Sequence, residues 1–270
     1  MNAKEFISQI EKDYPLKYAL EWDNVGLLVG MRDKEIRKVY IALEVTPDVV
    51  KAAIEQSVDI IITHHPLIMQ PMKRITNECF LTKAIIELLQ NDILCYAMHT
   101  NYDVLRMGKL ASARLGLQNT KPLDIVAKVE KKLETAEVQE EEELGIGEVG
   151  DLEVATTLQG VAQIVKEKFQ LSEVKIFGEL DKNIQKVAIV PGSGKSLITT
   201  AVANKADVLI TGDIGHHDGL DALVDGLAII DAGHYGTEYI FIEDMKNYMQ
   251  KNFADIQVQA HPISPPFCII

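Results

Sequence analysis

Histidines and carboxylates stand at the ends of several apolar, strand-like segments of this sequence. His64 and His65 follow the run DIIIT, and Asp103 lies just beyond LCYAMHT. His234 and Glu238 come after LAIIDAG. Imidazoles and carboxylates together suit a first-row divalent metal such as Zn, Mn, Fe or Ni. These residue types therefore predict a metal site.

The spacing of these residues allows a site with two ions. Neighbouring residues in a strand point to opposite faces, but Pro66 turns the chain directly after the histidine pair. His64 and His65 can then reach two adjacent ions. His234 and Glu238 are four residues apart, which places their Cβ atoms about 5–6 Å apart on one helix face. A carboxylate can bridge two ions, and Glu238 is the candidate for that role.

Other polar residues near these segments are candidates for catalysis. His217, Asp213 or His99 could carry a proton, since a histidine of ordinary pKa exchanges protons near neutral pH. Asn101 and Tyr102 are candidates for orienting a substrate. The strand ends therefore offer proton carriers and substrate contacts as well as metal ligands.

Strands and helices alternate around these polar residues. The segment KVYIALEVT, which begins at Lys38, predicts a strand, and Pro47 opens a helix that extends to about Gln56. The following run, VDIIITHHP, is continuously apolar up to its histidines, which is typical of a buried parallel strand. Ligands of open α/β sheets gather at the carboxyl ends of parallel strands, where all the candidate residues stand.

This strand–helix–strand pattern occurs twice in the chain. An offset of 148 aligns residues 38–63 with 186–211 without a gap, and it matches the second strand ADVLITGD to VDIIITHH. In the second copy, PGSGKS at 191–196 lacks the first glycine of a phosphate loop, so it predicts a tight strand-to-helix turn. The ungapped match predicts an internal duplication.

The duplication extends to the candidate ligands. LCYAMHTNYD resembles IIDAGHYGTE at an offset of 135, which matches His99 with His234 and Asp103 with Glu238. Spacing alone does not decide which of these two histidines binds metal.

Two α/β lobes follow from the duplication. We expect an N-terminal lobe of residues 1–125 and a C-terminal lobe of residues 126–270, with 235–270 able to pack back on the first lobe. The acidic run Glu140–Glu143 is typical of a solvated surface.

Composition narrows the function. The chain has 270 residues and a formal net charge of −13, which disfavours nucleic-acid binding because phosphates require clustered Lys and Arg. No apolar stretch approaches the ~18 residues of a membrane span. The three cysteines are odd in number and form no CxxC pair, which predicts a reducing, cytoplasmic location.

Five segments together resemble those of a known family. The sequences WDNVGLLVG, ITHHPLI, MHTNYD, TGDIGHHD and DAGHYGTE are similar to the signature segments of the Nif-three-like family, whose bacterial members are commonly labelled GTP cyclohydrolase 1 type 2 homologs. The resemblance covers nearly the whole chain. Longer members carry a domain inserted between the lobes, and this chain resembles the compact form.

The resemblance implies a fold, an assembly and a ligand set. The fold is two similar α/β lobes that face a shared metal-containing cleft, and the assembly is a toroidal homohexamer. A dinuclear site with two divalent ions per chain is implied, with ligands that correspond to His64, His65, Asp103, His234 and Glu238. His99 is left out of this set. Glu44 stands where the family usually has Asp, so its role here is open.

Two functions follow from these predictions. The first is a metal-dependent hydrolase that acts on a nucleotide-like or phosphoester substrate, because two ions can activate water and polarise a carbonyl or phosphoryl oxygen. The alternative is a non-catalytic metal-binding ring scaffold that recruits protein partners. An open coordination position would distinguish the catalytic site. Neither the metal nor the substrate is specified by the sequence.

Overall fold

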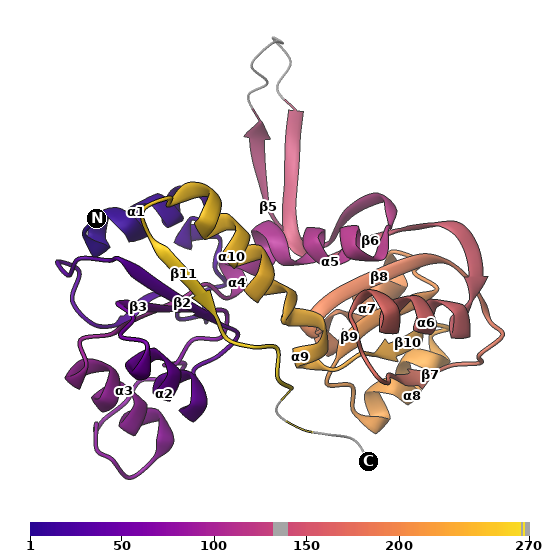
Figure 1. Cartoon of the computed structure of the whole chain (residues 1–270). Coiled ribbons are helices and arrows are strands. Elements are labelled where there is room, and N and C mark those ends of the chain that lie inside the picture. The colour runs from indigo at the N-terminus through magenta and orange to yellow at the C-terminus, as the bar shows by residue number, and fades with distance from the viewer. Residues whose placement is uncertain (132–139, 266, 268–270) are drawn as a thin grey trace. The chain divides into compact units, whose positions relative to one another are not determined.

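The chain forms two compact units (Figure 1). The computed structural model describes residues 1–131, 140–265 and 267. Unit 1 comprises Met1–Tyr102 and Tyr239–Ser264, and unit 2 comprises Asp103–Glu238 with the residues from Pro265 onward.

This division differs from the expected boundary between residues 125 and 126. The chain enters unit 2 at Asp103, through the π-helix η2 (Asp103–Met107) and helix α5 (Gly108–Leu115). It then enters strand β5 (Gln118–Lys131), which pairs with the sheet of unit 2. Residues 103–125 therefore belong to unit 2, because β5 finds its hydrogen-bond partners in that unit's sheet.

Unit 1 is built on a five-stranded sheet. Its strands, in spatial order, are β1 (Gly26–Val29), β4 (Leu94–Ala97), β3 (Ile60–Thr63), β2 (Lys38–Ala42) and β11 (Gln257–Ala260). All neighbours are parallel except β1, which runs antiparallel to β4. Every residue of β3 and β4 is buried, as the continuous apolar run predicted.

Helices connect and cover these strands. Those of unit 1 are α1 (Ala3–Asp13), the short η1 (Leu16–Tyr18), α2 (Pro47–Glu55), α3 (Phe80–Gln90), α4 (Thr100–Tyr102) and α10 (Ile240–Asn252). Thr46 caps α2, because its side chain accepts a hydrogen bond from Val49 N and Pro47 occupies the first turn. The predicted helix from Pro47 to about Gln56 is confirmed within one residue.

Unit 2 is built on a six-stranded sheet. In spatial order its strands are β5, β6 (Glu140–Thr157), β8 (Asn183–Ser193), β9 (Val208–Gly212), β10 (Ala228–Asp231) and β7 (Lys175–Phe177). Strands β8, β9 and β10 are parallel, and the outer pairings are antiparallel. Its remaining helices are α6 (Leu158–Lys168), η3 (Lys195–Leu197), α7 (Ile198–Ala203), α8 (His216–Val224) and α9 (His234–Glu238).

The two sheets share one strand order. In unit 1 the order β1-β4-β3-β2 carries an antiparallel edge strand followed by three parallel strands, and β7-β10-β9-β8 repeats this arrangement in unit 2. The predicted α/β class and the duplicated lobes are therefore confirmed in the topology.

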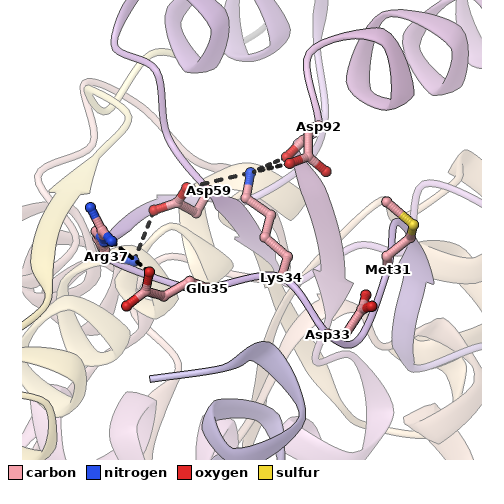
Figure 2. Close-up of a pocket in the computed structure, with 7 residues that line it drawn as sticks. All are labelled: Met31, Asp33, Lys34, Glu35, Arg37, Asp59 and Asp92. Atoms are coloured by element: carbon pink, nitrogen blue, oxygen red, sulfur yellow. Dashed lines mark hydrogen bonds and ion pairs between the residues drawn. The ribbon is translucent and has the colours of Figure 1, made fainter.

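Equivalent contacts of an aspartate fix the amino ends of the parallel strands in both units. The Asp59 carboxylate accepts backbone hydrogen bonds from Arg37 and Lys38 at 2.8 and 2.9 Å, and Lys34 contacts Asp59 and Asp92 (Figure 2). These residues line a pocket of about 480 Å³.

The counterpart in unit 2 is built from equivalent residues. Asp207 accepts from the backbone N–H groups of Gln185 and Lys186 at 2.9 and 2.8 Å, and Lys182 donates to Gly226 O at 2.7 Å. A repeated structural contact explains the Figure 2 pocket, which lies at the amino ends of the strands, opposite the edge where α/β sheets bind ligands.

Strands β5 and β6 form a long hairpin that extends from the unit 2 sheet (Figure 1). Lys128 Nζ lies 2.8 Å from Glu143 Oε1, and Lys109 Nζ lies 2.7 Å from Glu142 Oε1. The acidic run predicted as solvated surface thus lies in this ribbon, where Glu142 and Glu143 form ion pairs. Among the described residues, no helix is long and apolar enough to cross a bilayer.

Candidate metal centre

Three histidines gather at the carboxyl ends of β3 and β4 in unit 1. The backbone N–H groups of His64 and His65 both donate to Leu43 O, at 3.1 and 2.9 Å, which turns the chain as β3 ends. The ring centroids of His64 and His65 are 5.1 Å apart, and that of His99 lies 5.1 Å from His64 and 5.7 Å from His65. One nitrogen from each ring lies within 4.8 Å of the others, so this group can hold a metal ion.

Oxygen atoms orient the rings of this cluster through Nδ1. His64 Nδ1 donates to Met98 O at 2.8 Å, and His99 Nδ1 lies 2.9 Å from Asp23 Oδ1. His65 Nδ1 faces Glu44 Oε2 at 3.5 Å. In a neutral ring whose Nδ1 carries the proton, Nε2 carries the lone pair that a metal requires.

Asp23 is the buried anchor of His99. It also accepts hydrogen bonds from the backbone N–H and the hydroxyl of Thr100. Burial alone would raise the pKa of Asp23, but the hydrogen bonds from His99 and Thr100 outweigh it and lower the pKa to about 2. The carboxylate therefore remains ionised and fixes the orientation of the imidazole.

A histidine and a carboxylate meet at the carboxyl end of the unit 2 sheet. His234 begins the short helix α9, and its Nε2 lies 3.0 Å from Glu238 Oε2, one turn later. His234 Nδ1 lies 2.7 Å from Asp213 Oδ2 at the end of β9. Only 4% of the Glu238 surface is exposed.

Two glycines make room for this pair. A Cβ atom on Gly192 would lie 2.1 Å from Glu238 Oε1 and 3.4 Å from His234 Nε2. A Cβ on Gly212 would lie 2.4 Å from His234 N. The turn predicted at PGSGKS therefore forms a cradle for the carboxylate, and Gly192 needs its positive φ of 72° there.

The remaining predicted residues occupy different environments. Asp103 is half-buried and begins η2, and π-helical turns are frequent at functional sites. His217 is exposed in the first turn of α8, where its ring lies 5.3 Å from that of His216. Asn101 and Tyr102 are buried: Asn101 donates to Tyr14 O at 3.1 Å, and Tyr102 donates to Asp244 Oδ2 at 2.6 Å.

The donor chemistry of both units fits a divalent metal. Nδ1 of each of the four histidines, His64, His65, His99 and His234, faces an oxygen. Orientation of a ligand imidazole by a carboxylate or carbonyl on its second nitrogen is the usual arrangement in metal sites. Sequence reasoning missed Asp23, whose only sequence signal is its place in the turn-rich segment WDN.

Known proteins are similar to this chain in sequence and in fold. The sequence model of the family Duf34/NIF3 (NGG1p interacting factor 3) matches residues 1–265. A Clostridium acetobutylicum protein named GTP cyclohydrolase 1 type 2 homolog is 35% identical over 239 residues, which cover 88% of this chain and 86% of that protein. A Methanocaldococcus jannaschii protein of the same name is 35% identical over 263 residues, 96% of this chain and 98% of the relative. The solved structure described as a Bacillus cereus protein related to NIF3 superposes with a TM-score of 0.90 at 26% identity, covering 100% of this chain and 99% of the other.

Proposed function

This chain belongs to the Duf34/NIF3 family, and from that premise we propose that it is a dinuclear-metal protein that hydrolyses a nucleotide-like or phosphoester substrate. The orientation of four imidazoles by oxygen atoms at Nδ1 supports this proposal most strongly. The proposed ligands are His64, His65, Asp103, His234 and Glu238, and they hold two divalent ions drawn from Zn, Mn, Fe or Ni.

Bound divalent ions would supply an activated water and polarise a carbonyl or phosphoryl oxygen of the substrate. Residues of the chain orient the imidazole rings and balance the charge of the site. Asp213 holds the ring of His234, and the ionised Asp23 holds that of His99. His99 then presents Nε2 within the histidine cluster, where it can accept a proton or serve as a ligand.

Metal content per chain tests the ligand assignment. Protein purified without an affinity tag is expected to contain about two first-row ions per chain. His64→Ala and Glu238→Ala should each lose metal while their circular dichroism and assembly stay unchanged. His217→Ala is a matched control, because this histidine is exposed outside the clusters and should leave the metal content unchanged.

The double variant tests whether the two groups serve one centre. If they do, the losses in His64→Ala and Glu238→Ala will not add in the double variant, since residues of one network couple. Retention of both ions in each single variant would refute the ligand set. Metal binding without turnover of any nucleotide or phosphoester would refute the hydrolase.

The second candidate is a non-catalytic metal-binding ring scaffold that recruits protein partners. The β5–β6 hairpin favours it, because Ile125 and Val126 are exposed on this ribbon. Both lie at an irregularity of the arm, where the pairing of β5 with β6 shifts register between Ile125 and Ala127. We propose that such arms take part in a homohexameric ring. Analytical ultracentrifugation would detect the mass of a hexamer, and a monomeric mass would refute the proposed ring.

The proposed location is the cytoplasm. Cys79 and Cys95 are both free thiols in the described part of the chain, which fits a reducing compartment. With a net charge of −13, the proposed substrate is a small molecule rather than a nucleic acid.

A further inference from the structure

Trp22 is the only tryptophan of the chain, and it lies beside the histidine cluster of unit 1. Its surface is 61% exposed. The centroid of the indole ring lies 6.0 Å from that of His99, and the two ring planes are 77° apart. Tryptophan is highly buried on average, so a largely exposed indole next to candidate ligands requires an explanation.

The turn that carries Trp22 is fixed on both sides. Asp23 N donates to Leu20 O at 3.0 Å, and Leu20 N donates to Thr100 Oγ1 at 2.9 Å. The Asp23 side chain is fully buried against His99 and Thr100. Asn24 Nδ2 donates to Ile68 O at 2.6 Å. The backbone that carries the indole is therefore fixed, and much of the ring's surface is open.

We propose that Trp22 is a stacking platform for a planar heteroaromatic ring, of the purine type, that the protein binds beside its histidine cluster. This inference rests on the proposed function, because it names the substrate class of the same site. The face of an indole binds such rings by stacking, and a preorganised platform loses little entropy on binding. Contact with the ring would add binding energy that the chain's net charge of −13 does not supply at long range.

The single tryptophan makes its own fluorescence the direct probe. Guanosine 5′-monophosphate is titrated into metal-loaded protein, with ribose 5-phosphate as the ligand that lacks a base. We expect saturable quenching by the nucleotide and no quenching by the sugar phosphate. Equal quenching by both ligands, or none by either, would overturn the proposal.

Affinity measurements by calorimetry test the same contact independently. Trp22→Leu should weaken binding of guanosine 5′-monophosphate by about 5- to 150-fold, the range for loss of one stacked base. Trp22→Phe keeps an aromatic face and should recover part of this loss. Phe80→Leu is the matched control, because Phe80 is an exposed aromatic residue at the start of α3. Unchanged affinity in Trp22→Leu would overturn the proposal.

The design separates this inference from the proposed function. Metal content and hydrolysis are measured on the same Trp22→Leu protein. Failure of wild-type protein to hold metal removes the proposed function, whereas normal metal content and turnover with unchanged affinity removes only the stacking platform. A change of oligomeric mass in Trp22→Leu with unaltered nucleotide affinity would instead assign the indole to a contact between copies and overturn the proposal.

Discussion

Replacing Gly192 by alanine should displace the carboxylate of Glu238 and so weaken metal binding. The added Cβ atom would lie 2.1 Å from Glu238 Oε1, a contact so short that one of the two atoms must move, and 3.0 Å from Glu238 Cδ. The clashing atoms belong to the far end of a flexible side chain, so the carboxylate can rotate away from His234 Nε2 instead of forcing the backbone to move. The expected result is a lost ligand position rather than an unfolded protein.

Two contributions set the magnitude. The positive φ of 72° at Gly192 disfavours alanine by about 1–2 kcal/mol. A misplaced group in or next to a metal ligand shell typically lowers metal affinity about 10- to 100-fold. We therefore expect a modest fall in thermal stability together with a fall of this size in metal affinity, measured by competition with a chromophoric chelator.

Gly226→Ala separates these two contributions. Gly226 also has a positive φ, of 80°, but a Cβ atom there would meet nothing within 4 Å. This variant should lose a similar amount of stability through backbone strain and keep its metal affinity. Equal metal affinity in wild type, Gly192→Ala and Gly226→Ala would refute the cradle argument, and equal losses in both variants would show that the effect is global.

Three further results follow from the structure. Glu148 is 3% exposed, and burial raises its pKa from 4.5 to about 7. Its neutral form therefore stabilises the fold below pH 4.5, and this stability is lost as the pH rises through 7. In urea unfolding between pH 5 and 8, Glu148→Gln should remove about 3 kcal/mol of the pH dependence of the free energy of unfolding. Asp59→Ala and Asp207→Ala should each destabilise the protein by about 2 kcal/mol without loss of metal, because each removes the acceptor of two backbone N–H groups. Burial raises the pKa of Cys95 to about 12, so mass spectrometry should find native Cys79 alkylated and Cys95 untouched; rapid modification of Cys95 would contradict its burial.

The repeat made much of the fold accessible from the sequence. The buried strand VDIIIT and its partner ADVLIT are both short, uninterrupted apolar runs rich in Val and Ile, which is typical of a buried parallel strand. Pro47 likewise marked the start of α2 locally, and the structure adds the cap at Thr46. These features depend only on residues close in the chain.

The domain boundary and the hairpin were beyond such local reasoning. The sequence of β5 does not alternate apolar and polar residues, because Ile125 and Val126 are adjacent, and both are exposed in the structure. In sequence the segment therefore resembles a connector. This segment forms a strand because it pairs with β6, and the charged residues of β6 likewise show no alternation that would predict a strand with one buried face. Tertiary pairing decides the structure of such a ribbon.

The residues that orient the candidate ligands were likewise not predictable from local sequence. Asp23 precedes His99 by 76 residues, and only the folded chain brings its carboxylate to Nδ1. Glu44 stands where the family usually has Asp, and the structure places its longer side chain opposite His65 Nδ1 at 3.5 Å. Sequence patterns identified the candidate ligands, whereas the groups that orient them required three-dimensional contacts.

The duplicated copies provide similar chemistry by different residues. At the offset that aligns the strands, His64 and His65 correspond to Gly212 and Asp213. A side chain at Gly212 would collide with the backbone of His234, so the second copy has no room for the histidine pair of the first. Asp213 instead binds His234 Nδ1, the role that Asp23 fills for His99 from an unrelated turn. Arrival at the same carboxylate–imidazole contact from two non-equivalent positions is expected if ring orientation matters in each unit by itself.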